Sequence, residues 1–435
     1  MELKKYNQFN IIVMAMIVVL IMLGVVYNGI FSTAAFVLVC GYFALSSAEI
    51  IIADMFFLLP FATVFKPSPA STSFVSILLI AVIIIFMLRK KGKLKNTLFF
   101  MTGMIFAIFI VLVDMIQGSI SIASILRNLF GILFVYYLIE IEDKSILEQV
   151  IIAFGIGVFI TSVIALFASD IPNFYVYVRK VGYNLLVRNR FSGMNGDPNY
   201  YTIGLILVLY GALLIYEKRK LYFWGALFFT FFFGVQTYSK SFLIVFSVTL
   251  VLIFVDLIKN KNSKFMAVLF LIVIGVGTYL VFSGYFSAID FIIGRITTSN
   301  SLSEFTTGRS DIWDEYLRHI FNNGPLKIMF GEGLSAPLLN EKGSHNFYIE
   351  LLYYFGIIGW TMFATMFIIG YRSVSKGSKG FTAGKAGIVM LLMMYFNLQM
   401  VASNELYFHI AYIFLICKYD DQSLLKRLVE VKDEI

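Results

Sequence analysis

The sequence predicts an all-α polytopic membrane protein with about 12–14 transmembrane helices and two long outer loops. Three observations lead to this fold class. Hydrophobic residues make up 60% of the chain. Charged residues make up 14%, whereas a soluble protein carries about 25%. Apolar runs of about 18 residues, each long enough to cross a bilayer, recur from end to end.

The candidate spans begin close to the N-terminus. The first, Phe9–Tyr27, is longer than the core of a signal peptide and has no small-residue cleavage site, so we expect an uncleaved helix. Two others, Ile50–Phe65 and Leu406–Cys417, are short for a crossing. The remaining candidates are Ile30–Ser47, Phe74–Leu88, Thr97–Met115, Ile120–Ile139, Ile146–Ala168, Tyr200–Tyr216, Leu221–Val235, Phe242–Ile258, Phe265–Phe282, Phe347–Tyr371 and Ala386–Ala402. Together they predict a single integral membrane domain over residues 1–435.

The distribution of basic residues predicts the topology. The net charge is +8, and the main basic clusters fall on connections that share a side with the N-terminus. By the positive-inside rule this side is the cytoplasm, so we expect both termini there and the protein in the plasma membrane. A nucleic-acid partner is excluded, because topology accounts for the basic residues. The clusters are Arg89–Lys91, Glu217–Lys220, Lys259–Lys264 and Arg372–Lys385.

Two outer loops, residues 169–199 and 283–346, depart from this charge rule. Long loops often escape the rule, but cations gathered on the outer face also favour binding of an anion. We prefer the second interpretation. The first loop holds Arg179, Lys180, Arg188 and Arg190, and the second holds Arg295, Arg309, Arg318, Lys327 and Lys342.

The first loop ends in a predicted tight turn before a helix. Gly193, Gly196 and Pro198 are turn-forming residues. Asp197 or Asn199 can then cap the helix that follows. The arginines just before this turn are either solvated or directed at a ligand.

The second loop is too patterned for a disordered linker. Residues Ser310–Phe321 carry apolar side chains at helical spacing, which predicts an amphipathic helix on the membrane surface or over the protein's outer face. Turn signals follow at Gly324-Pro325 and at Gly331-Glu332-Gly333. Loops longer than about 15 residues in compact proteins are usually functional.

One of the three histidines lies at a water–membrane boundary. His319 falls on the polar side of the amphipathic helix, where we expect it to be solvated, and His409 falls inside the last span. His345 precedes an apolar run and has the intrinsic pKa of a general base. Glu350 follows one turn into that run and can orient His345 or line a cavity. Other ionisable groups in or near spans are Glu49, Asp54, Asp114 and Arg127.

The pattern His-Asn, nine residues, Gly, two residues, Gly resembles the signature of the O-antigen polymerases and O-antigen ligases, which are bacterial membrane glycosyltransferases. The resemblance covers roughly residues 190–359. It is carried by His345-Asn346 with Gly356 and Gly359; by Thr307-Gly308-Arg309 with Trp313, Gly324-Pro325 and Phe330 to Gly333; by Arg190 to Gly193 with Pro198-Asn199; and by Thr237 to Ser241, where Lys240 stands in place of the family's usual arginine.

This resemblance implies a GT-C-like fold and a substrate linked to undecaprenyl diphosphate. Arginines would stabilise the departing diphosphate in place of a metal, since a guanidinium stays charged and matches phosphate geometry. No cofactor or metal is expected. The implied catalytic residues are His345 as general base with Arg309 and Arg190, and the implied substrate-binding residues are Lys240, Arg188, Asn346, Glu350 and Asn199.

The partners implied are lipid-linked glycan donor and acceptor, the bilayer, a flippase and chain-length regulators. Polymerisation of repeat units into O-antigen or capsular polysaccharide on the outer face is the favoured activity. An O-antigen ligase that transfers glycan to a lipid A core is an alternative. A transporter of lipid-linked sugar is another, although transporters tend to show internal repeats, and a membrane sensor or scaffold is a third.

Overall fold

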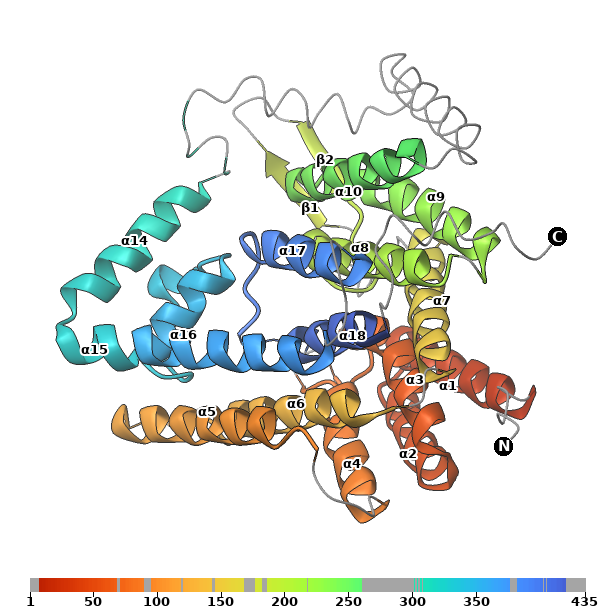
Figure 1. Ribbon diagram of the computed structural model, residues 1–435, viewed down its shortest axis with the longest axis horizontal. Helices are drawn as coiled ribbons and strands as arrows, with labels where there is room; N and C mark the ends of the chain where they lie inside the picture. The colour runs from red at the N-terminus through yellow and green to blue at the C-terminus, as the bar shows by residue number, and fades with distance from the viewer. Residues whose placement is uncertain are drawn as a thin grey trace. The chain divides into compact units, whose positions relative to one another are not determined.

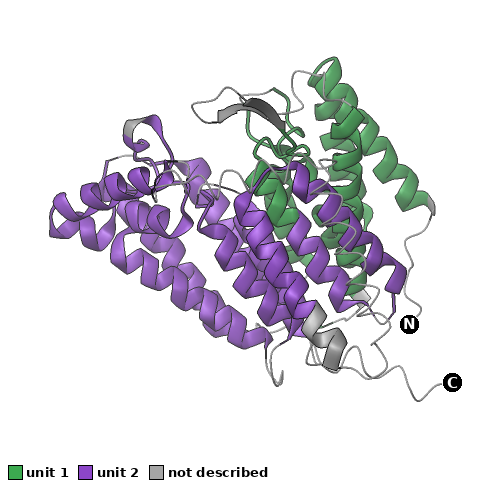
Figure 2. Ribbon diagram, turned by 90° about the horizontal axis from the view of Figure 1, so that it is seen from above, with its two compact units in different colours: residues 1–95, 140–204 green, residues 96–139, 205–435 purple. Residues whose placement is uncertain are grey.

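The computed structural model describes helices along most of the chain (Figure 1). The described residues are 8–68, 71–89, 95–118, 120–142, 145–167, 177–181, 186–216, 218–259, 301, 303, 306, 308–375, 382–401, 403 and 405–419. They form two compact units, coloured separately in Figure 2. Residues 1–95 and 140–204 make up the first, and residues 96–139 and 205–435 make up the second. The predicted single domain over residues 1–435 stays a prediction.

The first unit is built around a short buried helix. Helix α3 (Ala48–Leu58) continues into the 3-10 turn η1 (Leu59–Phe61) and packs against α7. Its side chains from Ile51 to Leu58 are buried, and its 11 residues are too few to cross a bilayer. The other elements of this unit are α1 (Gln8–Val26), α2 (Ile30–Leu45), α4 (Phe74–Arg89), α7 (Ser145–Phe167), β1 (Tyr177–Val181), β2 (Leu186–Arg190) and the start of α8 (Pro198–Leu214).

The all-α prediction is confirmed, and the first outer loop adds one short pair of strands. Strands β1 and β2 form an antiparallel hairpin in which Tyr177 pairs with Arg190 and Val181 with Leu186. Valine and tyrosine favour extended backbone, but five-residue strands give too short an alternation to stand out in an arginine-rich loop. The hairpin places Arg190 at the end of a strand.

The second unit has α16 (Phe347–Val374) at its centre. This helix packs against α5 (Thr97–Ile116), α14 (Arg309–Asn322), α15 (Pro325–Phe330) and α18 (Glu405–Tyr419). Alongside, α17 (Ala383–Tyr395) packs against α18 and α10 (Lys240–Lys259). The remaining elements are α6 (Ile122–Glu140), α9 (Lys220–Gln236), the rest of α8 and the 3-10 turn η3 (Leu339–Glu341).

The helices confirm the prediction of an α-helical membrane protein, although not the number of its spans. Among the described residues, five helices are long and apolar enough to span: Phe9–Val26, Thr97–Ile116, Ile122–Glu140, Ile146–Phe167 and Phe347–Val374. Five shorter apolar helices accompany them. The predicted span Phe265–Phe282 and the first part of the second loop, with Arg295, lie outside the described residues. The total of about 12–14 spans therefore stays a prediction.

Helix α16 is broken at Gly356. This residue has φ 63° and ψ −169° inside an otherwise regular helix, a region open almost exclusively to glycine. The break removes helical partners from the carbonyls of Tyr353 and Tyr354. Instead, the Tyr353 carbonyl accepts the N–H of Glu332 and the Tyr354 carbonyl accepts the N–H of Gly333, both at 2.9 Å. The second loop thus completes the backbone bonding of the kinked helix.

Candidate functional site

Arg309 is the first residue of α14, the predicted amphipathic helix. Gly308 precedes it with φ 79°, a left-handed conformation that glycine adopts without strain. The Nη1 atom of Arg309 donates to the backbone oxygen of Asn397 at 3.2 Å and to its side-chain oxygen at 3.0 Å. A guanidinium that grips both oxygens of one residue is held in a defined direction. Arg309 is therefore fixed to the turn that follows α17.

Trp313 connects the same face of α14 to His345. Positions four apart on a helix are neighbours, so Trp313 lies beside Arg309. Its Nε1 atom donates to the carbonyl of Ser344 at 2.9 Å. The next residue is His345, which is half-buried and has φ 48°, an uncommon conformation for a non-glycine residue. Arg309 and His345 thus belong to one neighbourhood of the second unit.

Asn346 begins α16 as its capping residue. Its side-chain oxygen accepts the N–H groups of Tyr348 at 3.0 Å and Ile349 at 3.2 Å. This bonding satisfies helix donors that would otherwise lack partners. The predicted role of Asn346 in substrate binding stays a prediction, but the residue has a structural task in keeping His345 at the mouth of the helix.

Glu350 holds the turn that binds Arg309. Its side chain is 2% exposed, and its Oε2 atom accepts the N–H of Met400 at 2.7 Å and that of Val401 at 3.0 Å. Asn397 lies on the same turn, three residues before Met400. Two backbone N–H groups that donate to one buried side-chain oxygen make this a firm attachment. Glu350 is one turn into α16, below His345.

The contacts described above form a closed circuit of linked residues, which we call the site ring. It runs from Arg309 to Asn397, along the turn to Met400, through Glu350 to the start of α16, and back through His345, Ser344 and Trp313. The guanidinium comes from α14, whereas the imidazole and the buried carboxylate come from the start of α16. The positive charge and the titratable base thus lie at one end of α16, where a chain of apolar helices adjoins polar loops.

Three predicted site residues belong to the first unit. Arg190 ends β2 and is buried. Asn199 is buried near the start of α8, and its N–H is accepted by Asp197 at 2.6 Å, so Asp197 is the capping residue of the two candidates. The Arg188 side chain lies outside the described residues. The meeting of these residues with the site ring stays a prediction.

Lys240 is the first residue of α10 in the second unit. The turn before it contains Tyr238 at φ 51°, and the N–H of Ser239 is accepted by the Thr237 hydroxyl at 3.2 Å. Helix α10 packs against α17, which leads into the turn carrying Asn397. Lys240 is half-buried. Its contribution to substrate binding stays a prediction.

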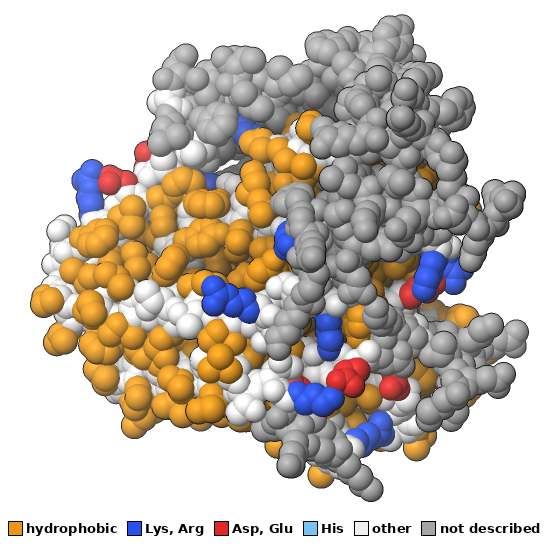
Figure 3. Space-filling view, viewed as in Figure 1, with side chains coloured by type: hydrophobic (Ala, Val, Ile, Leu, Met, Phe, Trp, Pro, Cys, Tyr) orange, Lys and Arg blue, Asp and Glu red, His pale blue; other side chains and the backbone are white. Residues whose placement is uncertain are grey.

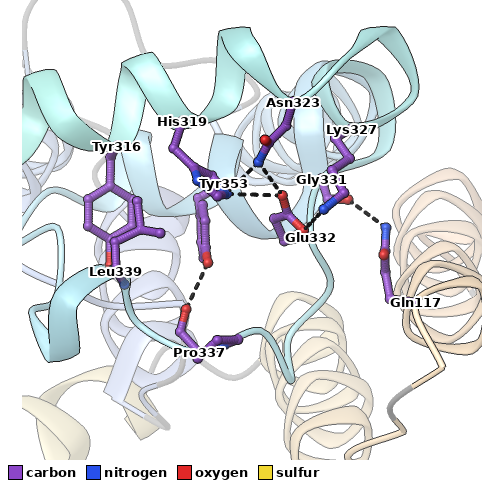
Figure 4. Close-up of polar contacts among 10 residues, drawn as sticks. All are labelled: Gln117, Tyr316, His319, Asn323, Lys327, Gly331, Glu332, Pro337, Leu339 and Tyr353. Atoms are coloured by element: carbon purple, nitrogen blue, oxygen red, sulfur yellow. Dashed lines mark hydrogen bonds and ion pairs between the residues drawn. The ribbon is translucent and has the colours of Figure 1, made fainter.

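His319 departs from the solvated state predicted for it. Figure 4 shows it directed at Glu332 and Asn323. Its Nε2 atom lies 3.1 Å from Glu332 Oε1 and 2.6 Å from Asn323 Nδ2, and Lys327 Nζ donates to Glu332 Oε2 at 2.7 Å. We call these four residues the Glu332 cluster. The amphipathic pattern placed His319 on a polar face but gave no sign that the Gly-Glu-Gly turn would fold back against that face.

Burial and hydrogen bonding shift the pKa of the Glu332 carboxyl group in opposite directions. Partial burial raises the pKa of its carboxyl group, but the bonds from Lys327, Asn323 and His319 outweigh burial and bring the pKa below its ordinary value. On the neighbouring turn of α14, burial raises the pKa of Tyr316. The Tyr316 hydroxyl donates to the Lys342 carbonyl at 2.7 Å. The cluster thus joins α14 to the loop leading to His345.

The loop residues 331–334 are hydrogen-bonded both to α16 and to residues at the end of α5. Besides the bonds to α16, the carbonyl of Gly331 accepts from Gln117 at 3.0 Å (Figure 4) and the N–H of Leu334 is accepted by Asp114 at 2.7 Å. A Cβ atom on Gly331 would lie 2.4 Å from the backbone of Tyr354. The glycine pattern of this loop therefore serves close backbone approach, which sequence reasoning treated as turn formation alone.

Within the described residues, no group of three or more His, Cys, Asp or Glu side chains is arranged to hold a metal ion. The chemistry that the site ring itself can supply is proton transfer at His345 and stabilisation of an anion at Arg309. Comparison of the chain with protein-family models, curated proteins and solved structures gives no match. Its function is accordingly inferred from its own residues.

Proposed function

We propose that the chain is a membrane glycosyltransferase that polymerises undecaprenyl-diphosphate-linked repeat units into O-antigen or capsular polysaccharide. The observation that carries the proposal is the site ring, which joins Arg309 to the His345 region through Trp313, Asn397 and Glu350. The ring lies in a unit made of apolar helices. Such a protein suits a substrate with a polyprenyl tail and an anionic head.

In the proposed reaction a sugar hydroxyl attacks the anomeric carbon of the lipid-linked donor. The new bond is carbon–oxygen, and the bond that breaks joins the anomeric carbon to the diphosphate. His345 accepts the hydroxyl proton as the bond forms. The electron pair leaves with the diphosphate, whose growing negative charge is stabilised by Arg309. Arg190 and Lys240 would add positive charge around the same leaving group.

The central test replaces His345 and Arg309 in cells that lack the native protein. We expect His345→Ala to abolish chain elongation while the protein and the lipid-linked single repeat accumulate normally. Arg309→Lys keeps the charge but replaces the planar guanidinium, whose Nη1 atom binds Asn397, with a shorter ammonium group, so we expect shorter and scarcer polymer. Glycan length on gels and precursor amounts by mass spectrometry give the readout.

Helix α14, which carries Arg309, also supplies a matched control. Arg318 is exposed and pairs with Asp314 one turn away, so Arg318→Lys tests the loss of a guanidinium outside the site ring. We expect full-length polymer from this control. Near-native polymer from His345→Ala, in contrast, would remove the base from the mechanism.

A lipid-linked sugar carrier is the second candidate, because helices broken in mid-course are common in transporters and α16 is broken at Gly356. Purified protein in vesicles with lipid-linked repeat units separates the two. Longer glycans indicate the polymerase, whereas translocation of unchanged substrate indicates the carrier. Transfer of glycan to an added lipid A core, without elongation, would indicate the ligase.

A further inference from the structure

Helix α15 presents apolar side chains outward although it belongs to a loop. Leu326 is 74% exposed, Met329 41% and Phe330 36%. Large apolar side chains gathered on a short segment mark an interaction surface. The one charged residue of this helix, Lys327, is bound to Glu332 on the other side. The outward face is therefore uncharged.

The contacts of α15 with α5 and α16 show how far α15 lies from the ends of these two helices. The rings of Phe330 and Phe109 stack with centroids 6.4 Å apart, and Phe109 precedes the last residue of α5, Ile116, by seven positions. At 1.5 Å per residue this is roughly 10 Å below the end of the helix. Likewise, a Cβ atom on Gly356 would lie 2.4 Å from the Met329 carbonyl, nine residues into α16.

Helix α15 contacts α5 through Phe330 and Phe109, and α5 carries an exposed apolar stripe along its length. That stripe extends to the last residue of α5, Ile116, which is exposed. The level of Phe330 is therefore below the upper limit of the apolar stripe. Figure 3 shows hydrophobic side chains over the face where Figure 1 draws α15, α16 and α5. The exposed residues of the stripe are Leu98, Met101, Ile105, Ile108, Leu112, Met115 and Ile116.

The backbone after α15 meets the condition for placement within a bilayer. Irregular backbone at membrane depth is tolerated where its polar groups are satisfied by protein. The carbonyl of Gly331 and the N–H groups of Glu332, Gly333 and Leu334 all have protein partners, and Gly331 is buried. A loop that met water on all sides would not need this protection.

We propose that α15 is a re-entrant segment that inserts its apolar face into one leaflet of the bilayer, at the boundary between headgroups and acyl chains. Its partner is the lipid surface, which interfacial helices enter by about 5–10 Å. The contact with α5, a helix that is long and apolar enough to span and that carries an exposed apolar stripe, favours lipid over a protein partner. Insertion anchors the far end of α14, the helix that carries Arg309, to the membrane.

The test measures lipid contact at single labelled cysteines in the full chain, reconstituted in nanodiscs. In a background with Cys40 and Cys417 replaced by alanine, a fluorescent label is attached at Leu326→Cys. Leu112→Cys, on the α5 stripe, is the lipid-facing control, and Asp314→Cys, exposed on α14, is the water-facing control. We expect a lipid nitroxide near the headgroup to quench position 326 about as strongly as position 112. Aqueous iodide should quench position 314 several-fold more than position 326.

Two outcomes would overturn the proposal. Iodide quenching at position 326 equal to that at position 314 would mean that α15 faces water. Protection from both quenchers would mean that protein covers it, either a second copy of this chain or another partner. Met329→Cys repeats the measurement on the same face should the Leu326 variant fail to fold.

Discussion

Arg309 grips Asn397 through both oxygen atoms of that residue, at 3.2 Å and 3.0 Å. The bond spans 88 positions of sequence and fixes the guanidinium relative to the turn between α17 and α18. In the proposed mechanism Asn397 is a positioning residue, because it acts on the substrate through Arg309.

Replacement of Asn397 by leucine tests this positioning. Asn397→Leu removes the side-chain acceptor, and a hydrogen bond to a charged group contributes about 1.5–3 kcal/mol. We expect polymer formation to fall by about tenfold or more at normal protein levels. Asn397→Asp keeps an acceptor oxygen and should restore most of the activity. Equal losses in the two variants would indicate a general packing role instead.

Removal of the Glu350 carboxylate should destabilise the second unit. Glu350→Ala leaves the buried N–H groups of Met400 and Val401 without their acceptor, and each costs about 1–3 kcal/mol. We expect a clear drop in the melting temperature of the purified protein. Asp314→Ala, which breaks an exposed ion pair, should change stability by less than about 1 kcal/mol. Similar melting temperatures for both variants would contradict the anchoring role.

A methyl group at Gly356 should be poorly tolerated. Gly356→Ala places a Cβ atom 2.4 Å from the backbone of Met329 and forces alanine into a conformation that costs about 1–3 kcal/mol. We expect loss of folded protein on size-exclusion chromatography. Gly225→Ala is the matched control, because a Cβ atom there would meet nothing within 4 Å. In helix α9 this change should be neutral or slightly stabilising.

Acid should weaken the attachment of the second loop through Glu332. Burial raises the pKa of this carboxyl, but bonds from Lys327, Asn323 and His319 leave it below the ordinary value of 4.5. A depressed carboxyl pKa stabilises the fold above pH 4.5 and loses that contribution as the pH falls through the folded value. We expect wild type to lose more thermal stability than Glu332→Gln on acidification below pH 4.5. Parallel acid profiles would count against the cluster.

Periodicity and apolar length predicted most helices within a few residues. The span Phe74–Leu88 corresponds to α4, and the amphipathic segment Ser310–Phe321 to α14. The span Ala386–Ala402 was placed too long at its end, because α17 stops at Tyr395. The residues after it are apolar enough to resemble helix, yet their N–H groups bond to Glu350. A tertiary bond of this kind leaves no periodic signal.

The candidate site was predictable in part. The family resemblance implied that Arg309 and His345 act at one site, and the contacts through Trp313 and Asn397 are consistent with it. Asn397 itself could not be found, since an asparagine in an apolar run looks like any buried polar residue. The Glu332 cluster was missed because its members meet only after the loop folds onto the kink of α16.

The exchange of backbone bonds between residues 331–334 and the kink at Gly356 has a consequence for biogenesis. The ribosome delivers this loop before α16, so the N–H groups of Glu332 and Gly333 await the carbonyls of Tyr353 and Tyr354, which have not yet been synthesised. Leaving them exposed in lipid would cost several kcal/mol per group. If the loop lies in the bilayer as proposed, we expect it to pack only after α16 has been synthesised. A chain truncated before Tyr353 would be a target for quality-control proteolysis, however well its earlier helices had inserted.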